Sequence, residues 1–201
     1  MPAQSRALRI TAQSEHRCPL VYRGNMLQYH EFMSGSLEIP APFPCGGLRV
    51  ADDWIDYNGH MNVGYYLIAF DQASDRFFDF IGVGLDYKEK TNCSTFTLES
   101  HLNFIQELRQ ADPVRFTFQL VDHDRKRFHG FSRMYHSNKG YVAATMEWLT
   151  LHVDLDQRRA AEMGNELYAR FAAIKAAHDE LELSLIHISE PTRRTPLSYA
   201  V

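Results

Sequence analysis

The sequence lacks several features that mark whole classes of protein. Its 201 residues include only three cysteines, Cys18, Cys45 and Cys93, and no Cys-x-x-Cys pair, so neither a zinc site nor a disulfide framework is indicated. No apolar run approaches the roughly 20 residues of a membrane-spanning helix. We therefore expect a cytoplasmic protein, in a reducing compartment, with no membrane partner and no metal.

The sequence also lacks a large excess of charge of either sign. The 21 Lys and Arg residues oppose 25 Asp and Glu residues, for a formal net charge of -4, so there is no basic field of the kind that drives nucleic-acid binding. The sequence has no Gly-x-Ser-x-Gly elbow, no Ser-His-Asp pattern and no metal-ligand spacing, which argues against α/β-hydrolases and metallohydrolases. With 45% hydrophobic residues, the chain suits one globular domain.

The two ends of the chain differ from its middle. Residues 1–45 show no core-like periodicity, and we interpret them as a poorly ordered extension with the native start at Met33 or Met26. Residues 183–201 resemble the translation of a sequencing adaptor, and we expect them to be poorly ordered. The predicted domain is then residues 46–182.

This domain reads as one strand, one long helix and four further strands. A wide apolar stripe at helical spacing predicts that the long helix packs on a sheet, and its members are Tyr66, Phe70, Ala73, Phe77 and Phe80. Strands are predicted at residues 47–54, 94–108, 114–120, 127–136 and 141–153, and helices at residues 62–81 and 160–182. The order predicts an α+β fold with a mainly antiparallel sheet wrapped around the long central helix.

The most informative stretch joins the first strand to the long helix. It reads Trp54-Ile55-Asp56-Tyr57-Asn58-Gly59-His60-Met61-Asn62-Val63-Gly64-Tyr65-Tyr66. Asn62 suits an N-cap, because its side-chain oxygen can accept from amides of the first helical turn, and Gly59 suits a turn that needs a positive φ. Short polar side chains beside the positive end of a helix can hold a developing negative charge. A capped helix start with a polar turn explains the same residues.

The run from Asp56 to Asn62, followed by Tyr65 and Tyr66, resembles the D-x-x-G-H-x-N signature of hotdog-fold acyl-CoA thioesterases. The resemblance is to the 4-hydroxybenzoyl-CoA thioesterase-like group and, within it, to the betainyl-CoA thioesterase type, over residues 46–180. It implies a single hotdog domain, here with an extra C-terminal helix. It also implies hydrolysis of a small or medium acyl-CoA, with betainyl-CoA as one candidate, by a homodimer or homotetramer that needs no cofactor.

The resemblance also assigns roles to the signature residues. Asp56 aligns with the family's nucleophile or general base, and His60 would orient that carboxylate or donate to the substrate. Asn58 would contact substrate or water. Gly59 and Asn62 would shape the binding turn, with the backbone amides after Gly59 as oxyanion donors. A turn-capping aspartate and a hydrogen-bonded structural histidine are the plain alternatives.

Two further side chains share one face of the predicted strand at residues 94–108. Glu99 and His101 are two residues apart, so they point to the same side. Because the family that the chain resembles pairs its subunits through this strand, we predict that Glu99 reaches the site of the partner subunit as a further catalytic carboxylate and that His101 contacts substrate. A solvated or salt-bridged pair explains the pattern equally well.

Substrate-binding residues are predicted at two other places. Arg125, Lys126 and Arg127 form the compact basic cluster of the domain, and we predict that they contact the phosphates of CoA, although a solvated hairpin tip has the same composition. For a trimethylammonium acyl group, carboxylates and aromatic rings would form a cation-binding pocket. The candidate rings are Tyr57, Tyr65, Tyr66 and Trp148.

Two other functions fit the same fold. A hotdog hydratase or dehydratase would add or remove water at an acyl-CoA, and a non-catalytic hotdog module would bind acyl-CoA without turnover. Release of free thiol distinguishes the thioesterase from both.

Overall fold

The computed structural model of the protein describes residues 38–181. The predicted adaptor-like tail and residues 1–37 of the predicted extension therefore lie outside the described residues. The first strand already begins at Phe43, so the predicted domain boundary at residue 46 falls inside a strand.

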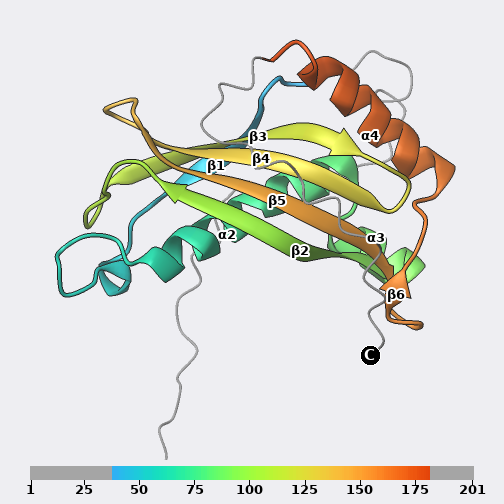
Figure 1. Ribbon diagram of the computed structural model, residues 1–201, viewed down its shortest axis with the longest axis horizontal. Coiled ribbons are helices and arrows are strands. Elements are labelled where there is room, and N and C mark those ends of the chain that lie inside the picture. Colours follow the sequence, from blue (N-terminus) through green and yellow to red (C-terminus); the bar gives the residue numbers. More distant parts are fainter. Residues whose placement is uncertain (1–37, 182–201) are drawn as a thin grey trace, which may run out of the picture.

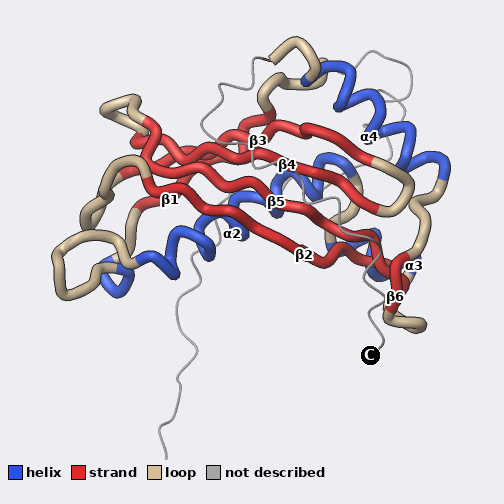
Figure 2. The backbone as a smooth tube through the Cα atoms, in the orientation of Figure 1, coloured by secondary structure: helices blue, strands red, loops and turns tan. Residues whose placement is uncertain are grey.

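The predicted α+β order is confirmed. The elements are β1 (Phe43–Arg49), the 3-10 helix η1 (Asp52–Trp54), α2 (Val63–Ile81), α3 (Leu85–Thr91), β2 (Cys93–Phe104), β3 (Pro113–His123), β4 (Arg127–His136), β5 (Val142–Asp154), β6 (Arg159–Ala160) and α4 (Asn165–His178). One antiparallel sheet has the order β1-β3-β4-β5-β2, with β6 paired to β5. This sheet curls over α2, as Figures 1 and 2 show.

The long helix α2 begins and ends where its sequence predicts. The Asn62 side chain accepts a hydrogen bond from the Gly64 N–H at 3.0 Å, which satisfies one amide of the first turn. At the other end Gly82 has φ of 85°, a left-handed conformation that glycine adopts without strain. The buried side of the helix comprises Tyr66, Ala69, Phe70, Ala73, Ser74, Phe77 and Ile81.

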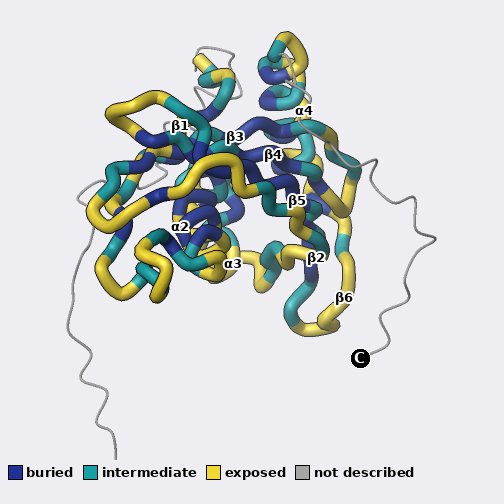
Figure 3. The backbone as a smooth tube through the Cα atoms, turned by 60° about the vertical axis from the view of Figure 1, so that its left-hand side comes forward, coloured by how far each residue is buried: buried dark blue, intermediate teal, exposed yellow. Residues whose placement is uncertain are grey.

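Aromatic rings form most of the contact between α2 and the sheet. Phe77 lies 3.9 Å from Phe118 between ring centroids, and Phe78 lies 5.6 Å from Trp148. A Cβ atom at Gly130 would come within 2.4 Å of the Phe118 ring, so the absence of a side chain at this position leaves space for that ring. Each fully buried large side chain contributes on the order of 1.5 to 3 kcal/mol. Figure 3 shows the resulting core in dark blue where α2 faces the strands.

The structure corrects the predicted first strand and adds a helix. β1 ends at Arg49 instead of residue 54, because the chain turns into η1 at Asp52. Helix α3 was not predicted. It has no buried residue, so it lacks the apolar stripe on which a helix prediction depends.

The strand predicted at residues 94–108 is also shorter, since β2 ends at Phe104. The backbone N–H groups of Ile105 and Gln106 both donate to the Ala143 carbonyl, at 2.8 and 3.0 Å. Because two successive N–H groups share one acceptor, the regular hydrogen-bond ladder between β2 and β5 ends here. Residues 105–108 therefore leave the sheet as a connecting segment.

Helix α4 lies along the part of β3 that β1 does not cover. β1 pairs with β3 only as far as Phe118. Beyond it, the Leu120 N–H donates to Nδ1 of His178 at 2.9 Å, and Nε2 of the same ring lies 2.9 Å from the Pro40 carbonyl. Nδ1 is therefore the acceptor and Nε2–H the donor. The predicted helix at residues 160–182 is shorter than expected, and the buried residues of α4 are Leu167, Phe171, Ile174 and His178.

We predict that acid weakens the fold through this histidine. Burial lowers the pKa of His178, against smaller opposing effects of the Pro40 carbonyl and Asp179, while Lys175 lowers it further. Burial likewise lowers the pKa of His123, which packs on α4 at Phe171. The unfolded chain then binds protons more readily than the folded one. Stability is fully present above the unfolded value of 6.5 and is lost as the pH falls below it.

The measurement is the free energy of unfolding in urea between about pH 8 and about pH 5. His178→Gln keeps an acceptor for Leu120 but cannot titrate, so its stability should fall less steeply below pH 6.5. Equal slopes for His178→Gln and wild type would contradict the assignment.

Candidate active site

A tight turn before α2 holds the signature residues. The Asp56 backbone carbonyl accepts from the Gly59 N–H at 3.0 Å, and the Asp56 N–H donates to the His60 carbonyl at 3.0 Å. Its carboxylate oxygen Oδ1 accepts from the Asn58 N–H at 2.7 Å. Gly59 has φ of 82° with open space around the position of a Cβ, so the turn needs glycine for its backbone angle.

Hydrogen bonds tie this turn to two other segments. The Met61 N–H donates to the Leu108 carbonyl at 2.7 Å, and the Asn62 N–H donates to the Trp54 carbonyl at 2.8 Å. The Trp54 ring stacks on Tyr65 of α2, with centroids 5.4 Å apart. The turn is therefore fixed to η1, to α2 and to the segment that follows β2.

The Asp56 carboxylate is mostly enclosed. Its side chain is 15% exposed, and Oδ2 lies 3.9 Å from Nδ1 of His60. That Nδ1 also lies 3.4 Å from the Met61 carbonyl, so both of its neighbours are acceptors, and we assign the imidazole proton to Nδ1. The 3.9 Å separation is too long for a hydrogen bond and leaves room for the carboxylate to take another partner.

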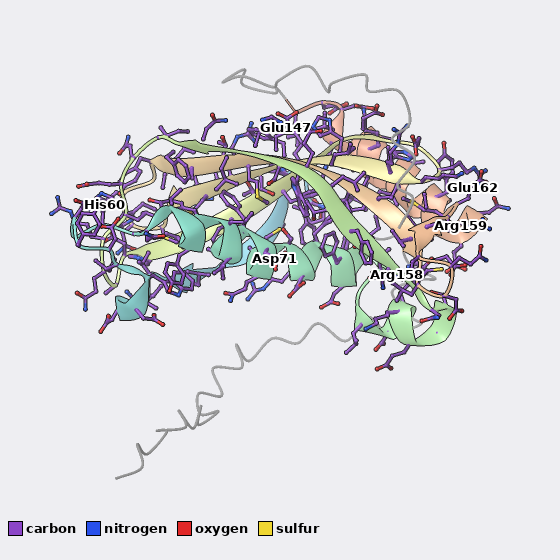
Figure 4. The ribbon with its side chains drawn as sticks, turned by 60° about the horizontal axis from the view of Figure 1, so that its bottom comes forward. His60, Asp71, Glu147, Arg158, Arg159 and Glu162 are labelled. Atoms are coloured by element: carbon purple, nitrogen blue, oxygen red, sulfur yellow. The ribbon has the colours of Figure 1, made fainter. Side chains whose placement is uncertain are left out.

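A pocket of about 340 Å³ opens beside this carboxylate, which is within the size range of small-ligand sites. Its lining residues are Asp56, His60, Met61, Val63, Tyr66, Phe104, Ile105, Gln106 and Glu107. They come from the turn, the first helical turns of α2, the end of β2 and the segment that follows β2. In Figure 4, His60 marks this end of the molecule. Burial raises the pKa of Tyr66, and the negative charge of Glu107 raises it further.

The structure brings some of the predicted site residues together. Asp56, His60 and Tyr66 line the pocket. The Asn62 side chain caps α2, and Tyr65 stacks on Trp54. Gly59 and the side chain of Asn58 are exposed on the turn, so the structure gives Asn58 a backbone contact with the carboxylate.

Glu99 and His101 lie on the face of the sheet that is turned away from α2. They are bonded to each other at 3.2 Å, and His101 pairs across the strands with Glu147. Trp148 faces α2, so its neighbour Glu147 and the cross-strand His101 face away from the helix. Figure 4 shows Glu147 opposite Asp71 of α2 across the sheet. Within one chain, the pair therefore does not join Asp56, and its role in the site of a partner subunit stays a prediction.

The basic cluster lies at the far end of the sheet. β3 runs 11 residues from the pocket end to the β3–β4 turn, on the order of 30 Å. There Arg125 lies 4.4 Å from the Tyr168 ring centroid and donates to Asn165 at 2.8 Å, and Arg127 is bonded to Asp124. The structure therefore separates Arg125, Lys126 and Arg127 from Asp56 in the same chain.

The aromatic rings predicted for a cation-binding pocket lie in different environments. Tyr66 lines the pocket, whereas Tyr57 is 97% exposed and Trp148 is buried under α2. Among residues 38–181, no group of three or more His, Cys, Asp and Glu side chains could hold a metal ion. In the same range no helix is long and apolar enough to cross a membrane.

The sequence analysis missed the second wall of the pocket. Phe104, Ile105, Gln106 and Glu107 were assigned to the interior of a strand, although they line the cavity. The adjacent apolar pair Phe104 and Ile105 breaks the alternation of a half-buried strand. That break is the signal from which the strand end could have been inferred.

Comparison with known proteins agrees with this geometry. The family model described as the Thioesterase-like superfamily matches residues 50–171. The chain belongs to this superfamily. The predicted family and the predicted class of thioester hydrolase are thereby confirmed.

Relatives with curated names extend the comparison. The chain is 39% identical to a betainyl-CoA thioesterase of Pseudomonas aeruginosa over 132 residues, which are 66% of this chain and 83% of the relative. It is 34% identical to an L-carnitine dehydrogenase/betainyl-CoA thioesterase of Rhizobium meliloti over 149 residues, 74% of this chain. The match spans only 30% of that longer relative.

Solved structures share the fold. A Staphylococcus aureus protein in complex with CoA superposes with a TM-score of 0.65 at 24% identity, over 73% of this chain and 92% of its own. The DHNA-CoA thioesterase of the same organism gives 0.61 at 14% identity, over 67% and 91%. The predicted hotdog fold is confirmed.

We predict that the cap at Asn62 sets the stability of the pocket wall. Asn62→Ala removes the acceptor of the Gly64 N–H and should lower the free energy of unfolding by about 1 kcal/mol. Asn62→Asp retains an acceptor at the helix N-terminus and should cost less. Urea denaturation of the three proteins tests this, and equal stability of Asn62→Ala and wild type would contradict it.

Proposed function

We propose that the protein hydrolyses acyl-CoA thioesters to the free acid and CoA, that betainyl-CoA is among its substrates, and that Asp56 carries the reaction. The central observation is the enclosed Asp56 carboxylate, which opens into the 340 Å³ pocket at the N-terminus of α2. The names of the relatives support the acyl-CoA and betainyl-CoA assignments.

Asp56 can act in two ways. As a general base it takes a proton from a water molecule that attacks the thioester carbonyl carbon. As a nucleophile it attacks that carbon directly, and water then hydrolyses the resulting anhydride. In both cases the carbon–sulfur bond breaks and the CoA thiolate leaves. The Asn58 N–H bond to Oδ1 holds the carboxylate, so Oδ2 is the reacting oxygen in this proposal.

The carbonyl oxygen gains negative charge during the attack and needs donors. The Met61 and Asn62 amides, expected as donors, already donate to the Leu108 and Trp54 carbonyls. The remaining candidates for oxyanion donors are therefore the backbone N–H groups of His60 and Val63, two residues that line the pocket. Val63 begins α2, where the positive end of the helix dipole favours an oxyanion.

We propose further that two copies pair along β2. This strand is at the edge of the sheet and exposes Phe96 and Leu98 at 40% and 39%. Exposed apolar edge strands favour pairing with another strand. Antiparallel pairing would set the far end of the partner's sheet beside the Asp56 pocket. In such a dimer, the basic cluster at residues 125–127 of one subunit would bind the phosphates of the CoA whose thioester lies in the Asp56 pocket of the other subunit.

Replacing Asp56 with Asn tests the chemistry. We expect thiol release from betainyl-CoA to fall at least about 100-fold, because the amide is neither base nor nucleophile. The amide oxygen can still accept from the Asn58 N–H, so the melting temperature should stay near that of wild type. Substantial activity in Asp56→Asn would overturn the assignment. No thiol release by folded wild-type protein from any acyl-CoA would favour a hydratase or a binding module.

Replacing Leu98 with Lys tests the dimer. A charge on the β2 edge should prevent strand pairing, so the variant should sediment as a single 23.2 kDa chain while wild type sediments at twice that mass. Thiol release should fall together with the loss of the dimer if the partner completes the site. A variant that sediments like wild type would show that the subunits do not meet along β2.

A further inference from the structure

We propose that Glu107, with the rings of Tyr66 and Phe104, recognises the positive charge of a quaternary-ammonium acyl group. These residues form the pocket wall that faces the Asp56 turn. The inference rests on the proposed thioesterase function and deepens it, since it states what selects the acyl group.

The charge of the pocket supports a cationic acyl group. Two of its nine lining residues, Asp56 and Glu107, are acids, and none is a lysine or an arginine. Asp56 is required for the chemistry, but Glu107 has no part in the proposed reaction. A second carboxylate in a small pocket repels an anionic acyl group and attracts a cation.

The dimensions of betaine put its charge within reach of Glu107. One methylene group separates the ammonium nitrogen from the thioester carbonyl carbon. When that carbon lies beside Asp56, the trimethylammonium group must occupy the same pocket. Glu107 lies close enough to Tyr66 for its charge to raise the pKa of the phenol, which places carboxylate and ring in one electrostatic environment.

The two rings supply the apolar part of such a site. Tyr66 and Phe104 meet edge to face, with centroids 5.1 Å apart. Tyr66 is buried on α2, whereas Phe104 is 51% exposed at the end of β2, so its ring is open to a ligand. Methyl groups of a quaternary ammonium bind to aromatic faces by cation–π attraction without hydrogen bonds.

Glu107 has a competing partner in Arg109. Both hydrogen bonds from this guanidinium, at 3.2 and 2.8 Å, go to Oε1. Within the described residues, no bond to Oε2 is recorded. The Arg109 side chain is 72% exposed and that of Glu107 is 54% exposed, so water and salt screen the ion pair. A ligand cation can therefore share the carboxylate.

The experiment compares two substrates of nearly equal shape. Betainyl-CoA carries the trimethylammonium group, and 3,3-dimethylbutyryl-CoA carries a neutral tert-butyl group in its place. For Glu107→Gln we expect kcat/KM to fall about tenfold with betainyl-CoA and to stay within about twofold with the neutral analogue. Glu162→Gln removes the same charge at the far end of the molecule (Figure 4) and should alter neither value.

A double variant separates recognition from release of Arg109. If Glu107 contacts the ammonium group, Glu107→Gln with Arg109→Gln stays impaired toward betainyl-CoA. If the loss arises because a released Arg109 repels the cation, the double variant recovers and the proposal is overturned. Equal losses on both substrates, or no loss on either, overturn it as well.

The design also separates this inference from the thioesterase function. Wild-type protein that hydrolyses the neutral analogue but not betainyl-CoA would retain the acyl-CoA thioesterase function, remove betainyl-CoA from its substrates and refute the cation site. If wild type hydrolyses neither, the proposed function fails. Calorimetric binding of the two thioesters to wild type and Glu107→Gln then decides the site, since only a cation site gives tighter binding of betainyl-CoA that depends on Glu107.

Discussion

The packing of aromatic rings between α2 and the curved sheet is the constraint on which the rest of the structure depends. Phe77 lies against Phe118, and Phe78 lies against Trp148. A Cβ at Gly130 would clash with this layer. Because these rings interlock near the C-terminal half of α2, they fix the direction of the helix. The direction of α2 in turn decides where its N-terminus meets the end of β2.

The pocket beside Asp56 follows from that meeting. The turn before α2 would be a mobile surface loop if only its own hydrogen bonds held it. The Met61 bond to the Leu108 carbonyl and the Trp54 stack on Tyr65 instead join it to two rigid elements. The enclosed carboxylate of Asp56 is thus held by backbone geometry. Core packing and site geometry are consequently coupled, as preorganised catalysis requires.

The sequence could predict those parts of the molecule whose signals are local. Asn62 and Gly82 give the ends of α2 through capping chemistry, and apolar spacing gives its buried face. The sequence did not show which face of β2 meets α2, and the position of Glu99 relative to Asp56 within the chain depends on that face. Glu107 was missed for a related reason, since the ladder ends through a shared acceptor on a distant strand. Both features depend on long-range pairing, to which a single sequence window is insensitive.

The two edges of the sheet differ, and that difference bears on function. On one side, β1 and then α4 cover β3, with His178 satisfying the Leu120 N–H that no strand reaches. On the other side, β2 exposes apolar side chains such as Leu98 and carries Phe104 into the pocket. The edge strand on the first side is β1, which carries Pro44 and a bulge between Pro44 and Gly47, and both features disfavour pairing with a further strand. The other edge strand, β2, also forms the pocket, so a partner on β2 would lie next to the acyl group and to the Asp56 carboxylate.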